Sequence, residues 1–263
     1  MPSHVIHGLV VALHIKLSHP SANELNQIIE RQFFALNLRD IVTESTKRCH
    51  TCSSLASVPK ALCPQMTSDP PQSINQYFAA DVIRRERQFI LVLREYVSSL
   101  TQAMLIENER HTTLQKSILS LLLNHLSINN SNVTVRVDPA PGFQALINDP
   151  LLQQHGISLE IGRHRNANKN PVADRAIQEV EEAIQRLEQH AEPINSYTLA
   201  VVINRVNSKL RSNGLSTREM VILRNQYTNE HIDLSDTQLL MNKHQAASQN
   251  NVHYAKSKAS LPR

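Results

Sequence analysis

The feature that most constrains the fold of this chain is a strand pattern that directly follows a long helical stripe. Residues 133 to 138, VTVRVD, alternate apolar and polar side chains, which is typical of a strand with one buried face. Before them, residues 109 to 126 place Leu114, Ile118 and Leu122 on one helical face. We therefore expect a helix that returns the chain to its sheet.

The remaining elements complete a recognisable order. Short segments read as strands over residues 77–83, 88–97, 102–106 and 157–161. A short helical piece is expected at 143–152, and two long helices at 171 to about 190, with Asn170 as N-cap, and at about 196–211. The order β-β-β-α-β-α-β-α-α is that of the ribonuclease H-like fold. This predicts an α/β core with a five-stranded mixed sheet flanked by helices.

A proline-rich stretch marks the expected domain boundary. Four prolines lie between Ser57 and Ser73 among Ser, Thr and Gln, a composition typical of a linker. Before it, residues 5 to 40 read as helical, with Cys49 and Cys52 on a turn. We expect a small helical domain at 1–57, a linker at 58–74, the core at 75–215, and a helical extension with an unstructured tail at 216–263.

Composition limits the class of protein only loosely. The chain has 263 residues, 41% of them hydrophobic and 19% charged, which favours a packed globular protein over a disordered one. An excess of 27 Lys and Arg over 23 Asp and Glu permits a polyanionic partner without requiring one. Three cysteines favour a reducing compartment over a disulfide framework. No run reaches the roughly 20 apolar residues that span a bilayer, so we expect no membrane association.

Two aspartates occupy unusual positions in the predicted sheet. Asp81 lies inside the apolar strand FAADVI, where an uncompensated carboxylate is costly to bury. Asp138 ends the strand that the helix enters, and ligand groups in α/β sheets gather at the carboxyl ends of neighbouring strands. If the two strands are adjacent and parallel, both carboxylates reach one edge of the sheet. Alone, Asp138 would also suit a turn-capping role before proline.

A third acid is expected from the helix that begins at Pro171. Asp174 lies in its first turn, and 35 residues separate it from Asp138, since 174 − 138 = 36. Glu179 points about 140° away from Asp174 around the helix, and Glu181 lies roughly 10 Å farther along it. Asp174 is therefore the best-placed candidate, although a first-turn acid also interacts favourably with the helix dipole.

The front of the chain carries two pairs of residues suited to zinc. His14 and His19 form an H-x4-H pair, and Cys49 and Cys52 form a C-x2-C pair. Zinc prefers four nitrogen or sulfur ligands in a tetrahedron, and one ion could stabilise a small helical module. Either pair alone is weak evidence, and the combination predicts a zinc site. His4, His7 and His50 are expected on the surface.

Together these motifs resemble the integrases of gypsy-type long-terminal-repeat retrotransposons. The resemblance runs from about residue 7 to about residue 240 through LHIKLSHPS, CHTC, FAADVIRR, VRVDPAPGF, NANKNPVADRAIQEV and SKLRSNGLSTREM. It implies an HHCC zinc domain followed by a catalytic core of the retroviral integrase superfamily. Such an enzyme is a polynucleotidyl transferase that performs DNA 3′-end processing and strand transfer. It acts on chromosomal DNA in the nucleus as a homo-oligomer.

The resemblance also implies the roles of the acids. Asp81, Asp138 and Asp174 would be the catalytic triad and would hold two Mg²⁺ or Mn²⁺ ions, which activate the attacking oxygen and stabilise the leaving one. The third acid of the family is usually Glu, and Asp reaches about 1.5 Å less far. Two alternatives therefore stay open: an inactive or domesticated DNA-binding protein derived from an integrase, and a zinc-dependent interaction module with a degenerate core.

Basic residues near the third acid are candidates for DNA contacts. They are Arg163, Arg165, Lys169 and Arg175. Positive charge there would position a phosphate chain without reading its sequence, and a solvated loop is the alternative. Arg84, Arg85 and Arg87 are interpreted as the surface of a hairpin. The chain ends in VHYAKSKASLPR where retroviral integrases continue into a β-rich domain, so we expect a piece of a longer polyprotein or a truncated gene.

Overall fold

The computed structural model describes residues 3–54, 74–85, 87–124, 132–162, 170–187, 193–211 and 214–233. The first range forms a helical module. Its helices are α1 (Ser3–Lys16), α2 (Ala22–Glu30), α3 (Leu38–Arg48) and α4 (His50–Ser54). The module has an apolar cluster of its own, made by Ile6, Val10, Leu25, Ile29, Leu38 and Val42.

The predicted five-stranded mixed sheet is confirmed. Its strands are β1 (Tyr77–Arg85), β2 (Gln88–Glu95), β3 (Thr101–Ile106), β4 (Val133–Val137) and β5 (Ile157–Ile161). They lie in the order β3-β2-β1-β4-β5. β1, β2 and β3 pair antiparallel, whereas β4 lies parallel to both β1 and β5. This is the strand arrangement of a ribonuclease H-like core.

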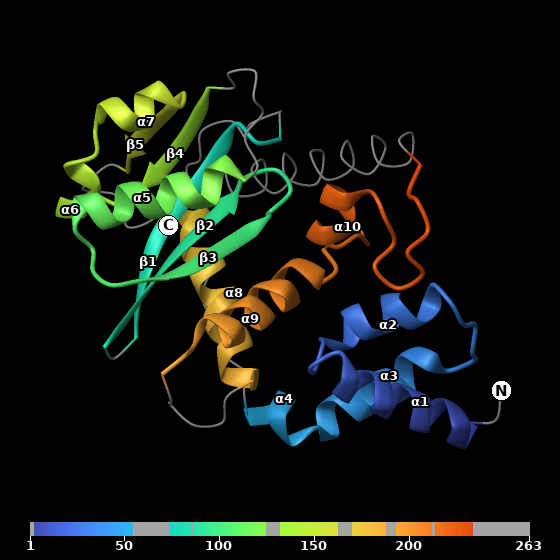
Figure 1. Ribbon diagram of the computed structural model, residues 1–263. Helices are drawn as coiled ribbons and strands as arrows, with labels where there is room; N and C mark the ends of the chain where they lie inside the picture. The colour runs from blue at the N-terminus through green and yellow to red at the C-terminus, as the bar shows by residue number, and fades with distance from the viewer. Residues whose placement is uncertain are drawn as a thin grey trace, which may run out of the picture.

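Helices cover both faces of the sheet (Figure 1). On one face lie α5 (His111–Leu123), α6 (Pro141–Gln144) and α7 (Pro150–Gln154), and on the other lie α8 (Pro171–Leu187) and α9 (Ser196–Ser208). The first face buries Phe78, Ile118 and Val135. The second buries Ile83 and Val180 with their neighbours. Alternation along the strands therefore supplies two separate apolar cores.

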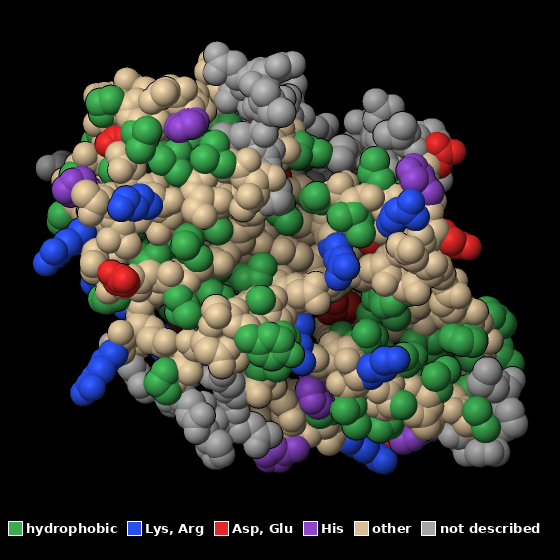
Figure 2. All heavy atoms as spheres, viewed as in Figure 1, with side chains coloured by type: hydrophobic (Ala, Val, Ile, Leu, Met, Phe, Trp, Pro, Cys, Tyr) green, Lys and Arg blue, Asp and Glu red, His purple; other side chains and the backbone are tan. Residues whose placement is uncertain are grey.

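Part of the helix prediction for residues 5 to 40 is wrong. The chain leaves α1 at a left-handed pair, Ser18 and His19, and it forms a loop between α2 and α3. Phe33 and Leu36, within the predicted helical range, lie in that loop with 44% and 78% of their surface exposed. Hydrophobic side chains accordingly gather on the outer end of the module, at the lower right of Figure 2.

Two predicted helices are shorter than expected. α5 begins at His111 rather than at residue 109, because the side chain of Asn108 accepts hydrogen bonds from Arg110 N and Thr113 Oγ1 and holds a turn there. α9 ends at Ser208, where Lys209 adopts an extended backbone. α8 spans Pro171–Leu187, and residues 188–190 of its predicted range lie outside the described residues. No helix in the described ranges is both long and apolar enough to cross a membrane.

The helical module packs against the far end of the core through α2. Glu24 Oε1 accepts a hydrogen bond from the backbone N–H of Leu210, after α9, at 3.1 Å. Arg31 forms an ion pair with Glu219 in α10 (Thr217–Ile222). The guanidinium of Arg31 also lies over the ring of Tyr227, 5.8 Å from its centroid. These polar contacts fix the module beside α9 and α10.

Some predictions lie outside the described residues. They are residues 58–73 of the expected linker at 58–74, the basic loop with Arg163, Arg165 and Lys169, and the tail from residue 234 onward.

Candidate active site and metal centre

Asp81 and Asp138 occupy neighbouring positions on two parallel strands. The last paired residues of β1 and β4 are Ala80 and Val137, so the two aspartates follow side by side. β1 packs Ala80 into the core under α5 and Ile83 into the core under α8. By alternation, Asp81 shares the face of Ile83, which α8 covers.

A cavity of about 510 Å³ opens beside these two carboxylates. Its lining includes Asp81, Asp138, Arg84 and Glu109, together with the segment from Pro139 to Phe143. Glu109 is a fourth acid that the motifs did not indicate. β3 runs parallel to β1, so Glu109, three residues after β3, lies at the same edge of the sheet as Asp138. The strand-end argument that found Asp138 would also have found Glu109.

The acids interact electrostatically. Burial, the largest cause, and the carboxylates of Asp138, Asp174 and Glu109 together raise the pKa of Asp81 to about 6, against a hydrogen bond from Val82 N that lowers it. Partial desolvation and the charge of Asp138 likewise raise the pKa of Asp174. Asp174 is exposed in the first turn of α8 and does not line the cavity. The structure therefore brings the three predicted acids within electrostatic range.

The same cluster suits a hard divalent cation. Oδ1 of Asp138 is buried and has no hydrogen-bond partner among the described residues. Carboxylate oxygens are the ligands that Mg²⁺ and Mn²⁺ prefer. A cation here would offset the mutual repulsion that raises the pKa of Asp81. The donor set therefore fits the implied ions.

Asn170 lies at the predicted cap position directly before α8, where its carbonyl oxygen accepts from Asp174 N, but its side chain bonds elsewhere. Its side chain is buried, and its Nδ2 donates to the carbonyl oxygens of Ala80 and Arg136 at 3.1 and 3.0 Å. Oδ1 has no partner among the described residues, so the side chain makes no capping bond there. The amide instead joins the start of α8 to both β1 and β4. Ala80 precedes Asp81 by one residue, and Arg136 precedes Asp138 by two.

Glu179, the weaker candidate for the third acid, belongs to a buried ion network. Its carboxylate pairs with Arg94 at 2.5 Å, with Arg211 at 3.0 Å and with Arg175 at 3.2 Å. Burial alone would raise its pKa, but Arg211 and Arg94 lower it to about 2. Glu179 is therefore a structural residue. Arg175, a predicted DNA contact, is 63% exposed although it is paired.

The four predicted zinc ligands converge in the helical module. All four ligand atoms of His14, His19, Cys49 and Cys52 lie within 4.8 Å of one another. His14 Nε2 lies 3.2 Å from His19 Nδ1 and 3.3 Å from Cys52 Sγ, and Cys49 Sγ lies 3.2 Å from His19 Nδ1. These separations match the edges of a tetrahedron built on Zn–N and Zn–S bonds of about 2.0 and 2.3 Å. The group could therefore bind zinc.

The local backbone explains how His19 reaches His14. Ser18 and His19 have positive φ values of 62° and 61°, and the N–H of His19 bonds to the carbonyl of His14 at 2.8 Å. This reversal turns the His19 ring back, edge-on to His14, with 4.9 Å between the ring centroids. Each left-handed residue without glycine costs about 1–2 kcal/mol. Cys49 follows α3, and Cys52 lies in α4 rather than on the predicted turn.

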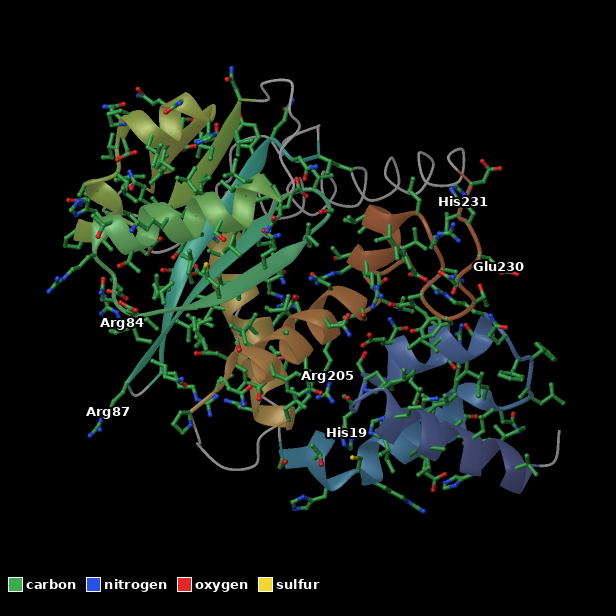
Figure 3. All side chains as sticks on the ribbon, viewed as in Figure 1. His19, Arg84, Arg87, Arg205, Glu230 and His231 are labelled. Carbon is green, nitrogen blue, oxygen red and sulfur yellow. The ribbon has the colours of Figure 1, made fainter. Side chains whose placement is uncertain are left out.

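Without a cation, this cluster favours its neutral forms. Burial lowers the pKa of His14 and of His19, and nearby cationic groups lower both further. Burial and the neighbouring Cys49 raise the pKa of Cys52 to about 11. Figure 3 shows His19 at the junction of the module and the core, near Arg205. A bound Zn²⁺ would reverse the thiol shift, because it favours thiolate ligands.

Comparisons with known proteins find similarity among solved structures. No family model matches the sequence, and no curated protein matches it. Among solved structures, the chain is similar to the catalytic core domain of BIV integrase, with 20% sequence identity and a TM-score of 0.46. The similar part covers 56% of this chain and 94% of that one. The functional assignment therefore depends on the geometry of the site itself.

Proposed function

We propose that this chain is an integrase that carries out metal-dependent 3′-end processing and strand transfer of DNA, as a polynucleotidyl transferase of a gypsy-type retrotransposon. The observation that carries the proposal is the pairing of Asp81 and Asp138 on adjacent parallel strands, with Asp174 approaching from α8. The zinc-ligand group in front of that core supports it.

The three acids would act as ligands of the metal ions. When bound, two divalent ions would supply Lewis-acid activation of the attacking oxygen and charge stabilisation of the leaving one. Asp81 interacts electrostatically with both other acids and would hold the ions together with Asp138 and Asp174. Water or a DNA 3′-hydroxyl attacks, so no protein nucleophile is needed.

The test is a strand-transfer assay on purified protein. The protein is incubated with Mg²⁺ or Mn²⁺, a target duplex and a duplex that ends in the terminal repeats of its own element, and the joined products are resolved on a gel. Asp81→Asn and Asp138→Asn should abolish joining. Asp40→Asn, which removes an exposed acid from α3, is the matched control and should leave joining unchanged.

A second candidate function is DNA binding without catalysis. The observation that favours it is the exposed position of Asp174 outside the cavity, combined with its shorter side chain. If the native protein yields no products while Asp174→Glu does, the native copy is an inactive integrase. DNA binding that persists in Asp81→Asn would then define its remaining activity.

The partners follow from the proposed reaction. They are the DNA ends of the element and the chromosomal target, which places the protein in the nucleus as a homo-oligomer on DNA. Light scattering of the protein with and without a terminal-repeat duplex measures the assembly. A particle that contains one chain per duplex contradicts the homo-oligomer.

A further inference from the structure

We propose that Arg84 contacts a phosphate of the DNA strand bound at the acidic cavity, and that Glu109 positions Arg84 for this contact. The inference rests on the proposed function, because it takes DNA as the ligand of that cavity. It assigns a role to two residues that neither the acidic motif nor the zinc motif includes.

Arg84 and Glu109 form a bidentate ion pair at the rim of the cavity. Arg84 Nε donates to Glu109 Oε1 at 2.6 Å, and Arg84 Nη2 donates to Glu109 Oε2 at 2.5 Å. Both residues line the cavity together with Asp81 and Asp138. The charge of Asp81 also acts on the Arg84 guanidinium. The Arg84 guanidinium is thus held beside the acids that would hold the metal ions.

The backbone around Glu109 is fixed from two sides. Asn108 Oδ1 accepts from Arg110 N at 3.0 Å and from Thr113 Oγ1 at 2.9 Å, which locks the turn into α5. Gly142 in α6 packs directly on the carbonyl oxygen of Glu109, so closely that a Cβ at Gly142 would overlap that oxygen. Glu109 therefore presents its carboxylate from a rigid turn, and Arg84 is orientated by it.

The guanidinium keeps donors for a ligand. Of its five N–H bonds, Glu109 accepts two, and the others have no partner among the described residues. The side chain of Arg84 is 68% exposed, whereas that of Glu109 is 23% exposed. A planar guanidinium matches the oxygens of a phosphate. An exposed ion pair contributes only about 0–1 kcal/mol to stability, so stability alone does not account for this arrangement.

Charge explains why a phosphate needs such a contact here. The carboxylates in the cavity repel a DNA backbone, and the ions that they bind neutralise the reacting phosphate but not its neighbours. Arg84 is placed to compensate a neighbouring phosphate. Arg87 differs, since it lies at the tip of the β1–β2 hairpin and points away from the core (Figure 3).

The experiment measures DNA affinity against salt concentration for the full chain with zinc bound. For Arg84→Ala, the slope of log K against log salt should fall in magnitude by about 1, with roughly tenfold weaker binding near 0.1 M salt. Arg39→Ala is the matched control, because Arg39 is 81% exposed and pairs with a glutamate, Glu30, on the helical module. It should leave the slope unchanged. Equal slopes for the two variants overturn the inference.

Two further measurements separate positioning from structure. In a series of duplexes, one phosphate at a time is replaced by a neutral methylphosphonate. Replacement at one position should weaken binding of the wild type, and the same replacement should not weaken binding of Arg84→Ala. Glu109→Gln, which keeps the shape but loses the charge, should weaken binding less than Arg84→Ala, and Arg84→Lys should not restore it. A methylphosphonate effect that persists in Arg84→Ala contradicts the contact.

The outcomes distinguish this inference from the proposed function. Strand transfer with an unaltered salt slope in Arg84→Ala overturns the role of Arg84 and leaves the integrase proposal intact. A reduced slope in a protein that yields no joined products supports Arg84 and contradicts catalysis. A wild-type protein that binds no DNA overturns both.

Discussion

The guanidinium of Arg31, at the end of α2, donates to the carboxylate of Glu219 in α10 across 2.9 Å, and that carboxylate is fully buried. Glu219 also accepts from Ser216 N in the capping box that begins α10. The side chain of Glu219 thus joins the helical module to the core and also caps the N-terminus of α10. Such a carboxylate cannot be neutralised without leaving buried partners unsatisfied.

Neutralising this carboxylate should destabilise the protein. Glu219→Gln removes the charge that Arg31 faces, and breaking a buried pair costs about 3–5 kcal/mol. Urea unfolding followed by circular dichroism should show a lower free energy of unfolding. Glu30→Gln, at an exposed pair with Arg39, is the control and should change the midpoint little. Equal midpoints for the two variants would show that the pair does not hold the module in place.

Zinc should be present at one ion per chain and should depend on all four ligands. Cys52→Ser and His14→Ala each remove one ligand atom from the converged group, and we expect zinc content close to zero with a loss of helical signal. Metal analysis after gel filtration measures the content. His50→Ala, at an exposed position beside Cys49, should retain the ion. Zinc that stays bound to both ligand variants contradicts the site.

The ion network of Glu179 should make stability fall in acid. Its pKa is about 2 in the folded state against an ordinary value of 4.5, so its contribution is present above pH 4.5 and is lost as the pH falls toward 2. Glu179→Gln should be less stable at pH 7 by about 3–5 kcal/mol, because Arg94 stays buried without its partner, and should flatten the pH dependence in that window. Glu182→Gln, one turn away, should behave as the wild type.

Asp81 should limit the stability of the protein without divalent ions. Its folded pKa of about 6 exceeds the ordinary 3.8, so the folded state binds the extra proton, and stability falls as the pH rises between these values. At pH 8, Asp81→Asn should be more stable than the wild type by about 3 kcal/mol, at about 1.36 kcal/mol for each unit of pKa difference. Adding Mg²⁺ should raise the melting temperature of the wild type and not of the variant. A lower melting temperature for Asp81→Asn than for the wild type at pH 8, without divalent ions, contradicts this prediction.

The sheet could be predicted because its strands carry strong local patterns. β4 and β5 match the predicted segments closely, since alternation or a short apolar run between turn residues specifies each one. The break at Ser18 and His19 could not be predicted, because neither residue is a glycine that would signal a left-handed backbone. The apolar loop at residues 31 to 37 is predicted as helix because the spacing of its apolar side chains fits a helix, and that spacing does not show whether they are buried or exposed.

The candidate site could likewise be predicted from the sequence only in part. Asp81 and Asp138 could be placed from the sequence, because a strand position and a parallel register determine where each carboxylate lies. The pairing of Glu109 with Arg84 could not be predicted, because it depends on the turn before α5 and on the contact with Gly142, which join residues far apart in the chain. The buried role of Asn170 also depends on two strands that only the fold brings together.

The amide of Asn170 has a consequence for metal selectivity. It bonds to β1 and β4 at once, so α8 cannot slide along the sheet without breaking both hydrogen bonds. As the third acid of the proposed function, Asp174 lies one helical turn after Asn170, so a shift of its helix cannot recover the missing methylene, about 1.5 Å. An ion held by Asp174 would then lie farther from its carboxylate. Mg²⁺ demands near-ideal octahedral geometry, so a cation that tolerates longer, irregular ligand distances would have the advantage there.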